Sequence, residues 1–328
     1  MPREHLVAVS YPVTEDYTTI TEQVLDGQAS VAYLRTMPDA ERLAVLSQAD
    51  ALITWNPGRE LPSAALEQAA VPRFVQLLSA GADGVDFSKI PAHVIVAGNV
   101  GAYARPIAEH VLAMTLALAR RLPERHAELA RGEFNQDEPL ITLDGAVCAV
   151  LGFGGIGKAT AALMRALGAR IQAVNTSGQT SEPVEFVGTM ADLDKVLAAA
   201  DVLVISLPLT NTTRGVIGAR ELALMKPTAI IVNVARGAII DEGALYKHLR
   251  EQPQFGAGID AWWHEPRRGK TFRVDFPFFE LPNLLGSPHN SGIIAGVMES
   301  AASMAAENVL RYLRGQPVTG VMRREDYI

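Results

Sequence analysis

The sequence of 328 residues has a single cysteine, Cys148, and one thiol excludes a disulfide within the chain. Cys148 stands in an apolar run, which favours a packed thiol over a nucleophile. No apolar run is long enough to span a membrane, and the first ten residues lack the charged head and long apolar stretch of a secretion signal. Together these absences predict a cytoplasmic protein with no membrane partner.

A strong excess of charge is also absent. Lys and Arg number 29 against 36 Asp and Glu, which gives a formal net charge of -7. A mildly acidic chain is not drawn to nucleic acid or to an anionic membrane, so neither is expected as a partner. Repeats and low-complexity segments are not evident, and 48% of the residues are hydrophobic. This composition suffices for a large core, and the length predicts two domains.

The chain does have a regular alternation of short β-rich runs and helical patterns. The near-continuous apolar character of these runs is typical of parallel strands that are buried on both faces. We therefore predict a doubly wound α/β fold built from βαβ units. The runs interpreted as strands are HLVAVS, ADALITW, RFVQLLS, HVIVAG, AVCAVLGFG, RIQAVN, ADVLVISLP and TAIIVNV, and helical spacing lies between them, as at residues 39–48 and 63–70.

Two longer helical patterns stand apart from this alternation. Residues 102–122 are apolar along one face and have Pro106 in the first turn, where proline suits a helix, so this helix is expected to bridge two domains or to pack on a partner. The polar residues 125–139 are interpreted as a surface connection, and residues 293–315 are predicted to form another long helix. These features predict a discontinuous arrangement, with residues 1–100 and 290–328 in one domain and residues 101–289 in the other.

Three glycines, Gly152, Gly154 and Gly157, form the pattern G-x-G-x-x-G between the run VCAVL and an amphipathic helical pattern at residues 156–167. In this context the first glycine allows a tight turn, the second lets backbone amides approach a pyrophosphate, and the third lets helix and strand pack closely. The positive end of the helix dipole then faces the phosphates. The pattern predicts a dinucleotide-binding site.

The next strand of such a site normally ends in a carboxylate that binds the adenosine ribose. Here the chain has Asn175, Thr176 and Ser177. A carboxylate would repel a 2′-phosphate, whereas neutral amide and hydroxyl groups can form hydrogen bonds with it. We therefore expect NADP to be accepted and lean toward NADP over NAD. No arginine immediately follows Asn175, so a positive clamp is missing or comes from elsewhere.

Three further segments place polar residues near the ends of strand-like runs, where open α/β sheets bind ligands. They contain Arg236, Asp260 with Glu265, and His289. Taken singly, each residue has an ordinary structural interpretation. Together they suit the reduction of a 2-keto acid, because arginine can hold the carboxylate and polarise the carbonyl, and histidine can donate a proton. A carboxylate beside the imidazole orients it and favours its protonated form.

The segments VNVARG, GIDAWWHEP and SPHNSG resemble, in order and spacing, the signatures of the D-isomer-specific 2-hydroxyacid dehydrogenase family. The resemblance implies an NAD(P)-dependent oxidoreductase that acts on the CH–OH group of small D-2-hydroxy acids or reduces 2-keto acids, close to the glyoxylate and hydroxypyruvate reductases. It implies a Rossmann domain, a flavodoxin-like substrate domain and a homodimer built around the helix at 102–122. No metal site is expected.

The resemblance also assigns roles to single residues. Arg236, Glu265 and His289 form the catalytic set. Substrate contacts are expected from Asn56, Ala80, Gly81 and Arg236. Cofactor contacts are expected from Gly152, Gly154, Gly155, Ile156, Gly157, Asn175, Thr176, Ser177, Leu207, Pro208, Thr212, Val234, Ala235 and Asp260.

The chain departs from the family pattern in several places. Tyr103 stands where an asparagine is usual. The loop after Glu265 is long and carries four basic residues, Arg267, Arg268, Lys270 and Arg273, which we interpret as solvated charges; the alternative is that they attract an anionic substrate or a cofactor phosphate. Trp262 and Trp263 could line the pocket, but packing is expected for at least one.

Two other functions stay open at this point. Transcriptional corepressors share the same fold and the three residues, so a non-enzymatic dinucleotide-sensing scaffold is the main alternative, although the chain lacks long disordered tails. A dinucleotide-binding structural protein with an inactive site is the second. Formate oxidation is disfavoured, because formate-oxidising relatives have an amide in place of Glu265.

Overall fold

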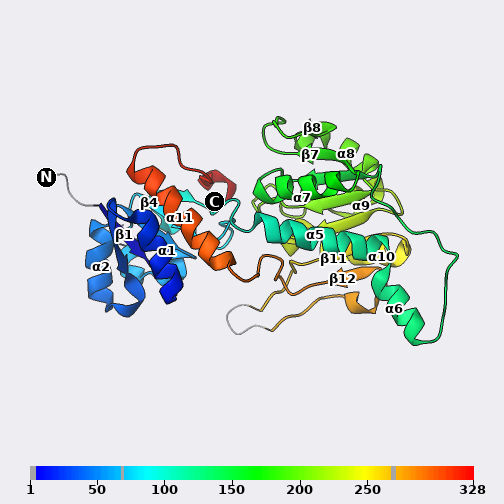
Figure 1. The fold of residues 1–328 in the computed structure, drawn as a ribbon, viewed down its shortest axis with the longest axis horizontal. Coiled ribbons are helices and arrows are strands. Elements are labelled where there is room, and N and C mark those ends of the chain that lie inside the picture. The colour runs from blue at the N-terminus through cyan, green and yellow to red at the C-terminus, as the bar shows by residue number, and fades with distance from the viewer. Residues whose placement is uncertain (1–4, 68–69, 267–270) are drawn as a thin grey trace. The chain divides into compact units, whose positions relative to one another are not determined.

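The computed structural model describes residues 5–67, 70–266 and 271–328. The chain divides into two compact units (Figure 1). Unit 1 comprises Met1–Tyr103 and Ile294–Ile328, and unit 2 comprises Ala104–Ile293. Within the described residues no helix combines the length and apolar character needed to cross a membrane.

Unit 1 contains a five-stranded parallel sheet in the order β2-β1-β3-β4-β5. This is the 2-1-3-4-5 order of flavodoxin-like folds, and it confirms the predicted doubly wound architecture. The sheet centre is fully buried, as the continuous apolar runs predicted. Its strands are β1 (His5–Val9), β2 (Ala29–Tyr33), β3 (Ala51–Thr54), β4 (Phe74–Leu77) and β5 (Ile95–Ala97).

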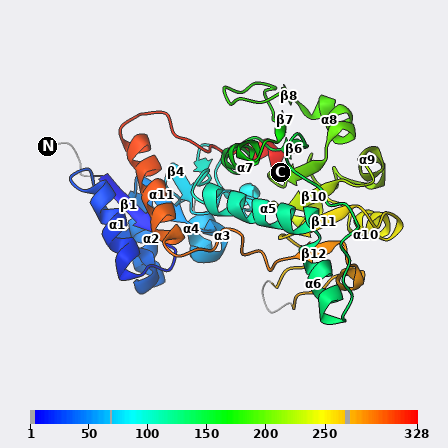
Figure 2. The same ribbon diagram turned by 45° about the vertical axis from the view of Figure 1, so that its right-hand side comes forward.

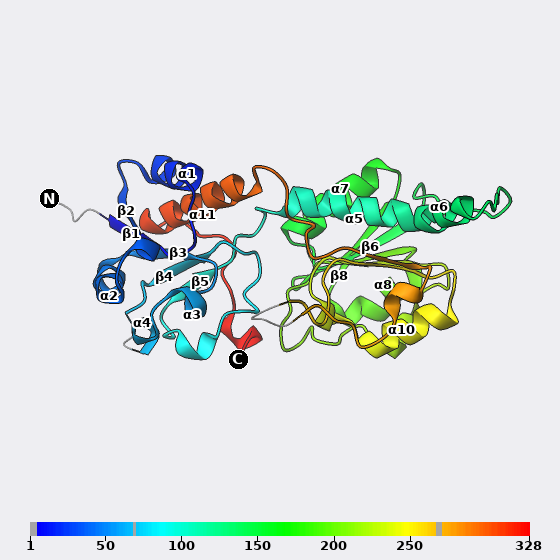
Figure 3. The same cartoon turned by 90° about the horizontal axis from the view of Figure 1, so that it is seen from below.

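Helices cover both faces of this sheet (Figures 2 and 3). One face carries α1 (Glu15–Leu25) and α11 (Val297–Leu313), which lie side by side, and the other carries α2 (Asp39–Gln48), α3 (Pro57–Glu60) and α4 (Ser63–Glu67). Ala305, Ala306 and Val309 of α11 are fully buried in one cluster with Val7 and Ile53. The end of the chain therefore completes the core of unit 1.

Unit 2 contains a seven-stranded parallel sheet in the order β12-β11-β10-β9-β6-β7-β8. Numbered from its first strand, this is the 3-2-1-4-5-6 order of Rossmann folds with one strand added. The order reverses between β6 and β9, so their carboxyl ends open on the crevice where such sheets bind ligands. The strands are β6 (Val147–Leu151), β7 (Arg170–Val174), β8 (Phe186–Gly188), β9 (Val202–Ile205), β10 (Ile230–Asn233), β11 (Gly256–Ile259) and β12 (Leu284–Gly286).

Two helical layers enclose the second sheet (Figure 3). On one face α5 (Ala104–Ala119) and α7 (Gly155–Ala166) pack on each other, and Val111 and Met114 of α5 enter the core there. The other face carries α8 (Leu193–Ala199), α9 (Ala219–Leu224) and α10 (Glu242–Glu251). Short 3-10 turns occur at Leu34–Thr36, Phe87–Lys89, Met190–Asp192, Gly237–Ile239, Phe278–Glu280 and Arg324–Asp326.

The helix predicted at residues 102–122 is interrupted near its end. Arg121 adopts a left-handed backbone with φ +48°, and α6 (Leu122–Ala130) begins at the next residue. The prediction of a connection over residues 125–139 is therefore wrong for residues 125–130, which are helical. Pro123 in the first turn and Glu124, which suits the positive end of the dipole, favour this helix start.

Candidate functional site

The turn between β6 and α7 has the geometry that its glycines predicted. Gly152 has φ +91°, and a Cβ there would lie 2.7 Å from the carbonyl carbon and oxygen of Ser206. A Cβ at Gly157 would lie 2.2 Å from the carbonyl oxygen of Gly152. Because backbone atoms block both positions, neither accepts a side chain without a shift of the main chain.

Gly154 differs from these two glycines, since no atom lies within 4 Å of a Cβ built there. It caps the N-terminus of α7 without a side-chain hydrogen bond, and no acidic residue stands in the first turn. The open space beside Gly154 therefore borders the free backbone amides and the positive end of a 12-residue helix, α7. This cradle fits the pyrophosphate of a dinucleotide.

The loop after β7 is organised by the side chain of Asn175. Its Oδ1 accepts hydrogen bonds from the amides of Ser177 at 3.0 Å and Gly178 at 2.7 Å, and its Nδ2 donates to the carbonyl oxygen of Gln179 at 2.8 Å. Asn175 thus shapes its own loop, while Thr176 and Ser177 are exposed. The hydroxyl groups are therefore the more accessible part of the predicted ribose-binding segment.

The remaining predicted cofactor residues follow the carboxyl ends of β9 and β10. Thr213 donates to the carbonyl oxygen of Pro208 at 2.6 Å, which closes the loop that holds Leu207, Pro208 and Thr212. Val234 and Ala235 are buried just after β10, and Gly155 and Ile156 open α7. The fold thus collects these segments at one edge of the unit 2 sheet.

His289 and Glu265 are in direct contact. His289 Nδ1 lies 2.6 Å from Glu265 Oε1, which also accepts the amide of Trp262 at 3.1 Å. A carboxylate only accepts, so Nδ1 carries a proton and Nε2 is left for another partner. His289 has φ +52°, an uncommon conformation for a residue other than glycine. The surrounding structure thus holds the backbone of His289 in a strained conformation.

Arg236 begins the turn after β10, and its Nη1 donates to the carbonyl oxygen of Ala235 at 2.7 Å. A Cβ at the next residue, Gly237, would lie 2.4 Å from the carbonyl carbon of Trp262. The residue after Arg236 thus lies close to the segment that leads to Glu265. All three predicted catalytic residues follow adjacent strands, β10, β11 and β12, of unit 2.

Asp260 is fully buried after β11. Its carboxylate accepts hydrogen bonds from the Ser287 hydroxyl at 2.5 Å and from the amides of Asn290 at 3.2 Å and Ser291 at 3.3 Å. His110, on α5, lies with Nε2 2.9 Å from the Ser287 Oγ. His110 and Ser287 were not among the predicted site residues. His110 lay within a predicted apolar helix, where a single histidine indicates no particular role.

Trp262 and Trp263 are held by packing and by hydrogen bonds. The indole of Trp262 is 6% exposed and donates to the carbonyl oxygen of Ser287 at 2.8 Å. The indole of Trp263 donates to the carbonyl oxygen of Ile240 at 2.7 Å and stacks on Phe278. The prediction that at least one of the two rings packs in the core is confirmed by the buried Trp262.

The residues predicted to bind substrate belong to unit 1. Asn56 caps α3 by accepting the Gly58 amide at 3.0 Å, and it donates to the carbonyl oxygen of Gly84 at 2.5 Å. Within the described residues the amides of Ala80 and Gly81 donate no hydrogen bond. The neighbouring Ser79 hydroxyl donates to the carbonyl oxygen of Gly81 at 2.8 Å. This fixed segment therefore offers two free donors.

Of the four basic residues after Glu265, Arg267, Arg268 and Lys270 lie outside the described residues. Arg273 is exposed and approaches Asp275 at 3.4 Å. In the described part of the chain, one group of three side chains could hold a cation, namely Glu242, His264 and Asp275. His264 Nε2 already lies 3.0 Å from Asp275 Oδ2 and 3.8 Å from Glu242 Oε2, so the three side chains contact one another directly.

Cys148 lies within β6 and is 1% exposed. Burial raises the pKa of its thiol to about 12, so the reactive thiolate is not populated near neutral pH. The prediction of a packed thiol is confirmed.

The Rossmann sheet, its open glycine turn and the histidine–glutamate pair define a dinucleotide-dependent oxidoreductase. The sequence profile described as "D-isomer specific 2-hydroxyacid dehydrogenase, NAD binding domain" matches residues 112–291. The chain belongs to this family, whose members are oxidoreductases that act on the CH–OH group of donors. The family match confirms the prediction of a nicotinamide dinucleotide cofactor, and it does not distinguish NADP from NAD.

Three relatives illustrate the match. The chain is 32% identical over 292 residues to a glyoxylate reductase of Aeropyrum pernix, which covers 86% of this chain and 85% of the relative. It is 31% identical over 320 residues to a D-3-phosphoglycerate dehydrogenase of Methanocaldococcus jannaschii, covering 96% of this chain but only 59% of that longer protein. A solved D-isomer specific 2-hydroxyacid dehydrogenase of Xanthobacter autotrophicus, in complex with NADPH and MES, is 25% identical with a TM-score of 0.79 and 99% of each chain covered.

Proposed function

We propose that this chain interconverts small D-2-hydroxy acids and 2-keto acids with NADP as its preferred cofactor, and that glyoxylate and hydroxypyruvate are the first substrates to test. The contact of 2.6 Å between His289 and Glu265 carries the proposal, because a carboxylate at Nδ1 orients the imidazole as an acid–base group requires. The family and the glyoxylate reductase relatives support the substrate class.

Each residue has a separate task in this reaction. A reduced nicotinamide held in unit 2 would supply the hydride for the carbonyl carbon. The guanidinium of Arg236 binds the substrate carboxylate and polarises the carbonyl. His289 Nε2 donates a proton to the carbonyl oxygen and takes it back in the reverse direction. Glu265 holds Nδ1 and stabilises the imidazolium.

Unit 1 is proposed as the substrate domain and unit 2 as the dinucleotide-binding domain. The free amides of Ala80 and Gly81 are suited to hold a carboxylate, and Asn56 is proposed as a further substrate contact. The match of the NAD-binding profile to residues 112–291 supports the role of unit 2. The cytoplasmic location stays a prediction from the sequence.

The preference for NADP rests on the loop after β7. The loop presents the exposed Thr176 and Ser177 and no carboxylate at its first three positions. Neutral donors can bind a 2′-phosphate, whereas the carboxylate of NAD-selective sites would repel it. The NADPH in the Xanthobacter autotrophicus structure shows that a relative of this fold accepts the phosphorylated cofactor.

A panel of short 2-keto acids, each assayed with NADPH and with NADH, tests the proposal. We expect turnover that is faster with NADPH, and His289→Ala should lower it by about 100-fold or more. His93→Ala is the matched control, because His93 is exposed and has no proposed role. A wild-type chain that binds dinucleotide and reduces none of the acids would instead support a dinucleotide-sensing scaffold.

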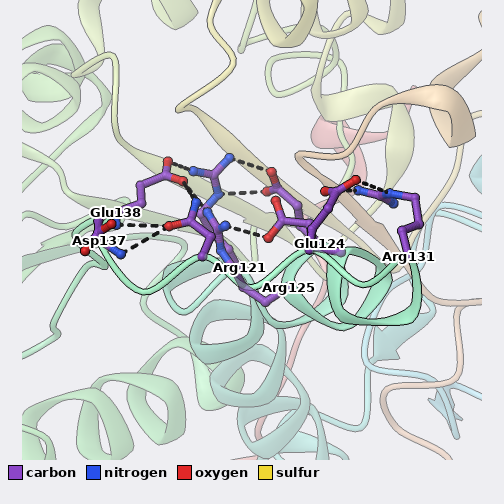
Figure 4. A network of polar contacts seen from close by, with 9 residues as sticks. Arg121, Glu124, Arg125, Arg131, Asp137 and Glu138 are labelled. Carbon is purple, nitrogen blue, oxygen red and sulfur yellow. Dashed lines mark hydrogen bonds and ion pairs between the residues drawn. The ribbon is translucent and has the colours of Figure 1, made fainter.

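A homodimer is also proposed, with the arm formed by α6 and residues 131–140 in the interface. Leu122, Leu129, Phe134 and Leu140 are all exposed on this arm around a hollow of about 550 Å³. Exposed apolar side chains gathered in this way are typical of interaction surfaces. The arm is also preorganised, because Arg121 pairs with Glu124 and Glu138, and Arg125 with Glu138 (Figure 4).

Light scattering after size-exclusion chromatography tests this assembly. The wild-type chain should have the mass of two copies, and a Leu129→Glu, Phe134→Glu double variant should have the mass of one. Arg131→Glu is the control, since Arg131 lies on the same arm but pairs only with Glu133 among the described residues. A monomeric wild type would contradict the proposal.

A further inference from the structure

Three side chains from separate elements of unit 2 form a hydrogen-bonded chain behind the catalytic pair. His110 comes from α5, Ser287 follows β12 and Asp260 follows β11. His110 Nε2 lies 2.9 Å from the Ser287 Oγ, which lies 2.5 Å from Asp260 Oδ1. The direct distance from His110 Nε2 to Asp260 Oδ1 is 3.8 Å.

The direction of the hydrogen bonds in this chain follows from counting protons. Asp260 receives two backbone amides besides the Ser287 hydroxyl, and three donors around one carboxyl group fit an ionised, acceptor-only carboxylate. The serine hydroxyl has one proton, and the short contact assigns it to Asp260. Ser287 Oγ can then only accept from His110, so Nε2 of His110 must carry a proton.

The loop that these contacts hold is the loop of the catalytic pair. The Asn290 and Ser291 amides, which bind Asp260, follow His289 directly. The carbonyl oxygen of Ser287 accepts the indole of Trp262, whose backbone amide donates to Glu265. The position of Ser287 therefore determines the position of His289, whose backbone has a strained φ. It also determines the orientation of the Glu265 carboxylate toward His289.

We propose that His110 is a positioning residue, which donates through Nε2–H to Ser287 and thereby fixes the loop of residues 287–291 and the His289–Glu265 contact. The inference rests on the proposed function for its catalytic consequence, but not for its proton assignment. Because His110 is on α5, the long helix of unit 2 sets the geometry of the acid–base pair through one side chain.

The proton assignment can be tested without any activity. The chain has seven histidines, so long-range proton–nitrogen spectra of the wild type and of His110→Gln identify the His110 ring by its loss. The spectrum should show a proton on Nε2, either as the neutral Nε2–H tautomer or as the imidazolium. A neutral ring with its proton on Nδ1 would overturn the proposal.

The catalytic consequence is tested by comparing two substitutions at one position. His110→Leu removes the donor, and we expect kcat to fall about 10-fold with the KM for the keto acid changed less than about 2-fold, because a small misplacement of reacting groups acts mainly on the chemical step. His110→Gln offers an amide donor near the same place and should recover kcat to within about 3-fold of the wild type. Ser287→Ala should reproduce the loss.

Two controls separate the possible failures. His93→Leu, at an exposed position of unit 1 outside the proposed site and the proposed dimer interface, should leave kcat unchanged. Equal rates for the wild type and His110→Leu, or no recovery with His110→Gln in a folded protein, would refute the positioning role. A wild type without turnover would refute the proposed function instead, and the nitrogen spectrum would still decide whether His110 donates to Ser287.

Discussion

The two parallel sheets of this chain differ in the turn that follows their first strand, because one turn is filled by a side chain and the other is open. In unit 1, β1 leads to Ser10 and to Tyr11, whose side chain is 1% exposed and belongs to the core. In unit 2, β6 leads to Gly152 and Gly154, and the space beside Gly154 is empty of protein atoms. Both turns lie at the carboxyl end of a parallel sheet, where ligands are expected. The two turns thus differ in their side chains: Tyr11 fills the space after β1, whereas the space beside Gly154 after β6 is open.

The comparison also separates two uses of glycine inside one turn. Gly157 is required by the protein, because its Cβ would collide with the main chain, whereas no protein atom opposes a Cβ at Gly154. Substitutions at these two positions should therefore have different consequences for stability and for binding.

The largest effect is expected for Gly157→Ala. Its Cβ would lie 2.2 Å from the Gly152 carbonyl oxygen, so α7 or the turn must move. We expect the free energy of unfolding to fall by about 3 kcal/mol, as for severe overpacking, and dinucleotide binding to be lost with it. Chemical denaturation monitored by circular dichroism measures the first, and NADPH fluorescence titration the second. Unchanged stability would contradict the close approach seen here.

The next effect is expected for Gly154→Ala, which sharpens the comparison. The new methyl group meets open space, so the unfolding midpoint should stay within error of the wild type. The dissociation constant for NADPH should rise about 10-fold, since the methyl group occupies space that the pyrophosphate needs. Titration of the nicotinamide fluorescence checks this. Equal affinity would show that the phosphates lie elsewhere.

A smaller, pH-dependent effect is expected from unit 2. Burial lowers the pKa of His248 below its ordinary value of 6.5, and its ring packs edge-on against Phe255. Below about pH 6.5, His248 binds a proton more readily in the unfolded chain than in the folded chain. The free energy of unfolding should therefore decrease as the pH falls, by at most about 1.4 kcal/mol per pH unit for this one proton.

Urea denaturation at several pH values between 5 and 8 measures this slope in wild type and in His248→Leu. The variant should have a shallower slope, whereas His93→Leu, at an exposed position, should keep the slope of the wild type. An identical slope in His248→Leu and wild type would remove His248 as the cause.

The smallest effect is expected in unit 1. The Tyr103 hydroxyl donates to the carbonyl oxygen of Leu78 at 3.1 Å, and burial raises the pKa of Tyr103, so the hydroxyl stays protonated near neutral pH. Tyr103→Phe keeps the ring and loses this bond. The free energy of unfolding should fall by about 1 kcal/mol, with cofactor affinity unchanged. A loss of cofactor affinity would show that this side chain also serves the site.

Strong local patterns made most of the fold predictable. The apolar runs identified most of the central strands of both sheets, and the helix at residues 39–48 was located to the residue. The buried strand β11 was missed, because its sequence GAGI has two glycines. The edge strands β2 and β8 and the helix α1 were missed, because they are partly exposed and lack a continuous apolar pattern. The end of α5 was missed because the left-handed Arg121 has no side-chain signature.

The candidate site was predictable where chemistry depends on residue type. Arg236, Glu265 and His289 were found from their order along the chain, and the structure brings the last two into contact. The contacts of His110 were not predictable, since they join residues 177 positions apart. Only the folded sheet shows that the end of β12 passes beside α5, and no spacing in the sequence encodes it.

The return of the chain into unit 1 has a consequence for how this protein is made. Unit 2 is one uninterrupted segment, so it leaves the ribosome whole and can fold at once. Unit 1 must wait, because its core includes Ala305 and Val309 from α11. During that interval the nascent chain exposes the apolar side chains of β1 and β3. Exposed apolar surface makes a folding chain prone to aggregation, so the need for chaperones is greatest then.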